Sequence, residues 1–195
     1  MAKTPKPAWT TGPGPGQAVP AGSLQALLKD GNLAGEWVLD PVKSRIGLKS
    51  RTIWGLAPVN GVFRKVSGNG TVRADGTANG TVTVAAASIE TKNTRRDTHL
   101  RSADFFDSAY YPDITFTADG IRPSGQGAAV TGTLTVRDRT RPLSFDAAAN
   151  IHDDGEITLD AQVRINRADF GLTWNQMGMA SMHATLTIQA AFTPR

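Results

Sequence analysis

The sequence of 195 residues contains no cysteine. Disulfide bonds, thiolate zinc sites and cysteine nucleophiles are therefore excluded. No run approaches the ~20 apolar residues that a membrane-spanning helix needs, so we expect no integral membrane segment. The first residues include lysine but lack the apolar segment of a secretory signal. These absences predict a soluble protein that stays in the cytoplasm.

A strong excess of either charge is also absent, because 21 Lys and Arg against 17 Asp and Glu leave a formal net charge of +4. A protein that binds nucleic acid gathers its positive charge in a stripe beside stacking aromatic side chains. Here the basic residues are spread along the chain, with one local excess at Lys92, Arg95, Arg96 and Arg101. We therefore expect no nucleic-acid partner and treat only this cluster as a candidate site.

Histidine is scarce as well, with three in the chain. Their positions do not give the short spacings that create a zinc site, so no metal is expected. Met177 and the methionines that follow it carry thioethers that suit a soft metal. Without cysteine nearby, they favour adaptable packing in the core or around a lipid-like ligand.

The start of the chain differs in composition from the remainder. Residues 1–22 are rich in Pro and Gly, which predicts a flexible tail. Residues 23–31 predict a short amphipathic helix, with Ser23 as N-cap and Gly31 at its end. Its leucines share one face: Leu24, Leu27 and Leu28. We expect residues 23–195 to form a single domain that begins with this helix.

From Glu36 onward, apolar residues recur with a period of two, which predicts antiparallel strands with one dry face. The sets predicted to face inward are Val82/Val84/Ala86/Ser88, Ile114/Phe116/Ala118, Val130/Gly132/Leu134/Val136, Leu143/Phe145/Ala147, Ile157/Leu159/Ala161/Val163/Ile165 and Leu186/Ile188/Ala190. Dipeptides of Asn or Asp followed by Gly predict tight hairpin turns. They begin at Asn60, Asn69, Asp75, Asn79, Asp119 and Asp154.

About eight strands joined by short turns can form either a sandwich or a closed barrel. In a sandwich, large side chains from two sheets interdigitate. The side chains predicted to face inward are mostly small, as in an eight-stranded barrel that holds one small ligand. We therefore predict an all-β, antiparallel barrel of about eight strands, with a short helix-loop insertion and the short N-terminal helix.

The segment 92–116 is the densest in charge and aromatic residues. Thr94 and Asp97 match a capping box, which predicts a short helix that begins at Thr94 and gives Asp97 a structural role. The aromatic residues that follow either cap the barrel core or line the mouth of a cavity. A catalytic use of Asp97, His99 and Arg101 is the alternative, although no nearby Ser or Cys completes a triad.

Several segments, in their order and spacing, resemble the YceI-like family of lipocalin-like proteins: ASIETKN, RRDTHLRSADFFD, YPDITF, VTGTLTVRDRTRPLSF and INRADFGLTWN. The resemblance covers the chain from Trp37 to the C-terminus. It implies an antiparallel barrel with a helix-loop insertion around a long hydrophobic channel, and binding of polyisoprenoids or similar long-chain apolar molecules without a shared catalytic activity. The residues that match the family motifs are Ser88, Ile89, Arg96, Asp97, His99, Leu100, Arg101, Phe105, Phe106, Asp107, Tyr111, Pro112, Phe116, Asp169, Phe170 and Gly171.

The sequence departs from the family pattern in its first strand. Lys43 precedes Ser44 where the family commonly carries a histidine, and the second family histidine, expected near Arg51, is also missing. Any role of those histidines therefore does not carry over. Many relatives also have a signal peptide and are periplasmic, in contrast to the cytoplasmic location expected here.

From the resemblance and the inward faces together, we expect carriage or storage of a long-chain polyisoprenoid or quinone-like lipid, with no cofactor. The alternatives are an enzyme that acts on a lipid-like substrate and a filled barrel that serves as a stress-response interaction module. A homodimer is left open. The predicted ligand contacts are Trp54, Phe63, Val84, Ile89, Leu100, Phe105, Phe106, Tyr110, Tyr111, Phe116, Leu134, Phe145, Phe170, Trp174 and Met177. The candidates for contact with a polar head group are Arg95, Arg96, His99 and Arg101.

Overall fold

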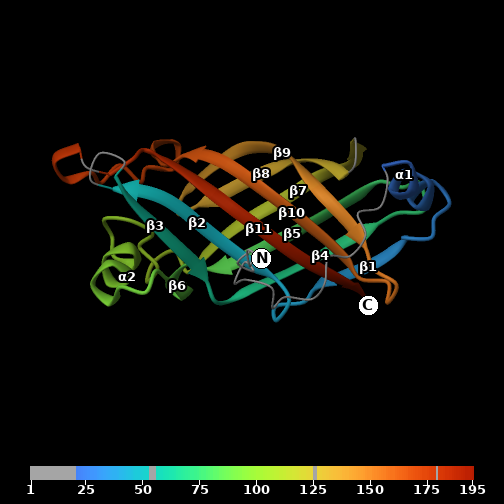
Figure 1. Cartoon of the computed structure of the whole chain (residues 1–195), viewed down its shortest axis with the longest axis horizontal. Coiled ribbons are helices and arrows are strands. Elements are labelled where there is room, and N and C mark those ends of the chain that lie inside the picture. Colours follow the sequence, from blue (N-terminus) through green and yellow to red (C-terminus); the bar gives the residue numbers. More distant parts are fainter. Residues whose placement is uncertain (1–20, 53–55, 125–126, 179) are drawn as a thin grey trace, which may run out of the picture.

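The computed structural model describes residues 21–52, 56–124, 127–178 and 180–195. Long strands run between the two ends of the molecule, with helix α1 (Ala21–Lys29) at one end and helix α2 (Thr94–Arg101) at the other (Figure 1). No helix of the described residues has the length and apolar composition to cross a membrane. The predicted flexible tail lies outside the described residues, except for its last two positions.

Eight antiparallel strands close into a barrel, which confirms the predicted fold. Each strand pairs with the next around the ring, and pairing of the first strand with the last completes it. Closure leaves no free edge in this part of the sheet. In ring order the strands are β1 (Gly35–Leu39), β4 (Val66–Val72), β5 (Ala78–Ala85), β7 (Asp113–Ser124), β8 (Gly127–Val136), β9 (Arg139–Ile151), β10 (Ile157–Asn166) and β11 (His183–Pro194).

Three further strands extend the wall toward α2. The last strand, β11, is long enough to pair with two strands along one edge: residues 192–194 with β1 and residues 185–189 with β2 (Arg45–Thr52). Strand β3 (Ala57–Phe63) pairs with β2, and β6 (Ile89–Glu90) pairs with β3. The barrel wall is therefore continuous with the β2–β3–β6 extension beneath α2.

The period of two predicted the inward faces of most strands correctly. Side chains from every predicted set reach the barrel interior, including Phe116 on β7, Phe145 on β9 and Ile188 on β11. The exception is the end of the first set, because β5 stops at Ala85 and residues 86–88 form a 3₁₀ turn. The partner β7 begins opposite Ala85, so the chain beyond has no strand to pair with on that side.

Only two of the predicted hairpin turns are correct. Gly76 and Gly155 have φ of +79° and +83° in the turns that join β4 to β5 and β9 to β10. In the others the glycine lies within a strand, and at Gly80 a Cβ atom would lie 2.7 Å from the Asn69 carbonyl oxygen of the neighbouring strand. Glycine there permits close approach of two backbones rather than a turn. The four incorrect turns are Asn60-Gly61, Asn69-Gly70, Asn79-Gly80 and Asp119-Gly120.

The N-terminal helix forms as expected but begins earlier than predicted. Helix α1 starts at Ala21, two positions before the predicted cap at Ser23. Alanine has the highest helix propensity, so the helix extends back through it. Gly31, with φ of +69°, follows the last helical turn as predicted.

Helix α2 begins at Thr94 as predicted, although its cap is a different residue. The Asn93 side chain accepts a hydrogen bond of 3.0 Å from the Arg96 backbone N–H, so Asn93 is the N-cap and the predicted capping box is wrong. Asp97 is buried, and its Oδ1 accepts hydrogen bonds from the backbone N–H and the hydroxyl of Thr91. Its role is thus structural, as expected: it joins α2 to the end of β6.

The Asp97→Ala substitution leaves the buried N–H and hydroxyl of Thr91 without this acceptor. An unsatisfied buried group costs about 1–3 kcal/mol, so we expect the melting temperature to fall by about 2–12 °C. Differential scanning calorimetry measures this change. Asp153→Ala, which removes an exposed carboxylate, is the control and should melt as the wild type does. An unchanged melting temperature for Asp97→Ala would contradict the structural role.

Candidate ligand-binding cavity

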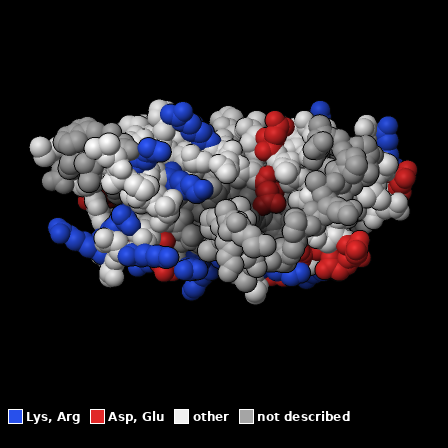
Figure 2. Space-filling model, in the orientation of Figure 1, with Lys and Arg blue, Asp and Glu red and all other residues white. Residues whose placement is uncertain are grey.

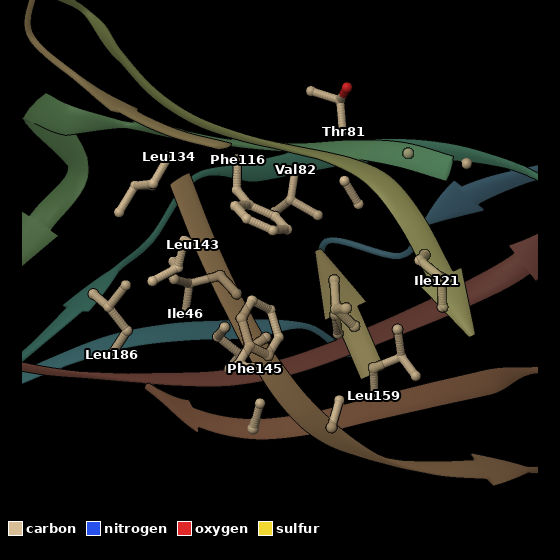
Figure 3. A pocket seen from close by; sticks show the side chains of 18 of the residues that line it. Ile46, Thr81, Val82, Phe116, Ile121, Leu134, Leu143, Phe145, Leu159 and Leu186 are labelled. Carbon is tan, nitrogen blue, oxygen red and sulfur yellow. The ribbon is translucent and has the colours of Figure 1, made fainter. Parts of the chain in front are cut away.

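The barrel encloses an almost entirely apolar cavity of about 250 Å³. In Figure 3, Ile46, Leu143 and Leu186 project into it from different strands. Phe116 and Phe145 pack against one another there, with ring centroids 5.5 Å apart. Because an apolar cavity of ~150 Å³ holds benzene, this one accommodates about ten carbon atoms as it stands. An apolar chain fits such a site, whereas a polar molecule would lose its hydrogen bonds to water on entering it.

The two ends of the cavity are lined by different parts of the chain. At one end Leu24, Leu28 and Leu33 from α1 and the loop after it reach the cavity, together with Trp37. At the other end are Leu100 from α2 and the aromatic residues of the insertion that follows it. The α1 leucines were not among the predicted ligand contacts. Their shared face indicated burial, but not which surface would cover them.

Most of the predicted ligand contacts do line the cavity. Phe106 is buried and packs edge-on against Phe63, with ring centroids 5.9 Å apart. A ligand inside the cavity would contact the residues that line it. The predicted contacts that line the cavity are Phe63, Val84, Leu100, Phe105, Phe106, Phe116, Leu134, Phe145 and Phe170.

The tyrosine pair lies outside the cavity. The backbone N–H groups of Tyr110 and Tyr111 both donate to the Asp107 carbonyl, in a turn after Phe106. As a result Tyr110 is 76% exposed, and Tyr111 packs beneath the guanidinium of Arg137. The predicted contact of these tyrosines with a ligand inside the barrel is therefore not supported.

Three other predicted contacts also lie elsewhere. Ile89 is fully buried, but it packs outside the cavity, where its Cδ1 atom occupies the space beside Gly61. Met177 is 79% exposed. Trp174 lines a separate pocket at the α2 end. Trp54 lies outside the described residues.

That separate pocket, which we call the mouth pocket, has a volume of about 570 Å³ and adjoins the cavity. The residues that line both are Leu48, Leu100, Phe105, Arg167 and Ala184. The mouth pocket differs from the cavity in having polar groups, among them Ser50, Thr52 and Asn93. The two spaces together can hold a molecule with an apolar tail and a polar head.

The predicted head-group residues divide between the mouth pocket and the structural contacts around it. Arg95, Arg96 and His99 line the mouth pocket. Arg96 is also engaged with Thr91, whose hydroxyl and carbonyl oxygens accept from its guanidinium at 2.7 and 2.9 Å. Arg101 does not line the pocket and donates to the Ile89 carbonyl at 2.7 Å. Arg95 is exposed and has no hydrogen-bond or ion-pair partner among the described residues.

His99 is surrounded by aromatic side chains. Its ring lies edge-on to those of Trp174 and Phe105, at centroid distances of 4.3 and 5.3 Å, and its Nε2 is 3.3 Å from Asp104 Oδ2. Asp97 bonds to Thr91 and Arg101 to Ile89. The three residues of the catalytic alternative therefore contact different partners.

Arg167 belongs to this site although it was not among the predicted site residues. It is buried between the cavity and the mouth pocket, and donates to the carbonyls of Leu172, Trp174 and Ser181 at 3.1, 3.1 and 2.7 Å. Desolvation by burial lowers the pKa of its guanidinium, which nevertheless stays charged at neutral pH. No carboxylate among the described residues pairs with it. Its position within the motif INRADFG was the only signal in the sequence.

The surface charges also differ between the two ends of the barrel. On the face shown in Figure 2, Lys and Arg gather over the half that carries α2, while most Asp and Glu lie toward the α1 end. The positive potential of the α2 half favours approach of a negatively charged head group.

Lys43, at the position of the missing family histidine, has a contact outside the cavity. Its Nζ lies 2.8 Å from Oε2 of Glu156, whose side chain is 8% exposed. The hydrogen bond to Glu156 raises the pKa of Lys43. The pair joins the turn after β1 to the turn before β10, and neither residue lines the cavity.

Comparison with known proteins agrees with this architecture. The family model of the YceI-like domain matches residues 37–192. Among curated relatives, Protein YceI of Escherichia coli O6:H1 is 34% identical over 112 residues, and that of Salmonella arizonae is 32% identical over the same length. These alignments cover 55% of this chain and 58% of each relative, so the chain spans just under three fifths of the curated relatives it matches.

Solved structures share the fold. BcnA of Burkholderia cenocepacia superposes with a TM-score of 0.72 at 21% identity, over 78% of this chain and 98% of that one. A polyisoprenoid-binding domain from Saccharophagus degradans superposes with a TM-score of 0.65 at 16% identity, over 82% of this chain and 98% of that domain. A Campylobacter jejuni YceI protein superposes with a TM-score of 0.56 at 25% identity, over 70% of this chain and 86% of that protein. The family model spans most of the chain and the barrel agrees with it, so the protein belongs to the YceI-like family.

Proposed function

We propose that this protein binds a polyisoprenoid or a similar long-chain apolar molecule inside its barrel, for carriage or storage and without catalysis. The observation that carries the proposal is the almost entirely apolar cavity inside the barrel. The Saccharophagus degradans domain, which has the same fold, is described as polyisoprenoid-binding and supports the same class of ligand.

The size of the cavity constrains how such a ligand is held. Burial of about ten carbon atoms contributes roughly 8 kcal/mol at ~0.8 kcal/mol for each CH₂. Association costs about 4–15 kcal/mol, so a chain confined to the cavity gains little net affinity. A long ligand therefore also occupies the mouth pocket, where Leu48, Leu100 and Phe105 continue the apolar surface. The tail determines the affinity.

The mouth pocket then selects the head group. Arg95, Arg96 and His99 surround it, and the buried charge of Arg167 lies at its base. An exposed arginine contributes about 0.2–1 kcal/mol to such a contact, so these residues adjust the preference between ligands of equal chain length. A location in the cytoplasm stays a prediction, and assembly as a homodimer stays open.

The alternatives from the sequence receive less support from the structure. In a stress-response module with a filled barrel, side chains would leave no continuous cavity. The described residues instead surround an apolar cavity. An enzyme at the mouth requires Asp97, His99 and Arg101 to act on one substrate, whereas their contacts point to different neighbours. The binding function is consistent with both observations.

Leu134→Trp tests whether the cavity is the binding site. Leu134 is buried and faces the cavity from β8, so an indole there fills the space that the ligand needs. We expect affinity for farnesol to fall at least tenfold, measured by native mass spectrometry of the protein titrated with this alcohol. Thr133→Trp, which adds the same side chain to the adjacent position on the opposite face of β8, should bind as the wild type does. Equal binding by both variants would contradict the proposal.

Arg95→Ala tests the head-group role of the mouth pocket. The change should lower affinity for palmitate by up to about fivefold, or ~1 kcal/mol, and leave affinity for hexadecanol unchanged, because only the carboxylate meets the lost charge. Calorimetric titration of both ligands measures the difference. Arg141→Ala, an exposed arginine on β9 away from the mouth pocket, is the matched control. Equal losses of affinity for palmitate and hexadecanol would show that Arg95 does not distinguish between the two head groups.

A further inference from the structure

We propose that α1 is a stopper that sets the maximum length of the ligand tail. The proposal rests on the proposed function and assigns a specificity-determining role to residues outside the part of the chain that the family model matches. That match begins at residue 37, whereas α1 covers Ala21–Lys29.

The side chains of the stopper form the end wall of the cavity. Leu24 and Leu28 from α1 and Leu33 from the loop after it are 7%, 7% and 8% exposed, and all three line the cavity. The indole N–H of Trp37 donates to the Leu33 carbonyl at 3.0 Å and fixes the loop against the first strand of the barrel. This end of the cavity is therefore closed by carbon atoms that a ligand tail would meet.

The barrel is shaped to receive α1 at this end. Ala128 and Ala149 are 2% and 3% exposed and lie in the same cluster as the stopper leucines, so small residues on β8 and β9 leave room for them. At Gly76, in the turn between β4 and β5, an added Cβ would lie 3.0 Å from the Leu28 carbonyl oxygen. The close contact between this turn and α1 indicates that the stopper is packed firmly against the end of the barrel.

The opposite end of the cavity has the features of an entrance. Figure 1 places α1 and α2 at opposite ends of the strands. At the α2 end the cavity continues into the mouth pocket, which is larger and carries the polar groups. A ligand whose head stays in the mouth pocket therefore points its tail at α1. The distance from mouth to stopper then limits the tail length.

The volume of the stopper side chains predicts the size of the effect. Replacing leucine by alanine removes three carbon atoms, so Leu24→Ala combined with Leu28→Ala vacates the space of about six carbons. One isoprene unit has five carbon atoms. The double variant should therefore accept a tail longer by about one isoprene unit.

The experiment compares all-trans prenyl alcohols of two to eight isoprene units, titrated against the full chain and followed by native mass spectrometry. For the shortest alcohol that the wild type excludes by length, we expect the double variant to gain at least tenfold in affinity, or ~1.4 kcal/mol. Leu27→Ala is the matched control, because Leu27 lies on the same helix and packs against the same cluster but does not line the cavity. Its length profile should equal that of the wild type.

Two results would overturn the inference, and they are distinguishable. If the wild type and the double variant bind the series with the same length limit, α1 does not set that limit and the proposed function stands. If neither protein binds any alcohol of the series, the proposed function fails together with the stopper. Should the double variant not fold, Leu24→Ala alone decides the question with straight-chain alcohols that differ by single carbon atoms. Its length limit should rise by about three carbons, and an unchanged limit would count against the stopper.

Discussion

The structure depends on the pairing of its first and last barrel strands. Strand β1 joins β4 on one side and the end of β11 on the other, with Trp37 opposite Pro194 and Leu39 opposite Phe192. Without this pairing, the sheet would have two exposed edges and no enclosed interior. Closure turns the inward faces of eight strands into one wall, and an apolar cavity follows because those faces carry few polar groups.

Side-chain contacts to backbone carbonyls organise the end that carries the mouth pocket. Arg167 holds the loop after β10 through three carbonyls, Arg101 binds the Ile89 carbonyl, and Arg137 reaches the carbonyls of Ala103 and Phe105. Charged side chains at this end of the barrel therefore serve mainly to position the chain. Arg95 is the exception, because it extends toward the mouth pocket without a partner among the described residues.

Much of the fold could be predicted because alternation is a local property. Residues two apart in a strand face the same side, so the spacing of Phe116 from Ala118 identifies an inward face before the partner strands are known. The aromatic half of the insertion was predictable only in part. Phe105 and Phe106 line the cavity, whereas Tyr110 and Tyr111 follow a turn at Asp107 that the amino-acid pattern did not indicate.

By itself, the sequence determined the class of fold, the inward faces and the family, since each depends on local periodicity or on continuous motifs. Only the tertiary structure decided which residues meet at the ends of the barrel. The glycine at position 80 serves strand contact and not a turn, because Gly70 of β4 lies opposite it and the Asn69 carbonyl oxygen leaves no room for a Cβ atom. Leu24 and Leu28 line the cavity because strands from the second half of the chain curve around them. Such contacts join residues distant in sequence, and the closure of the barrel brings them together.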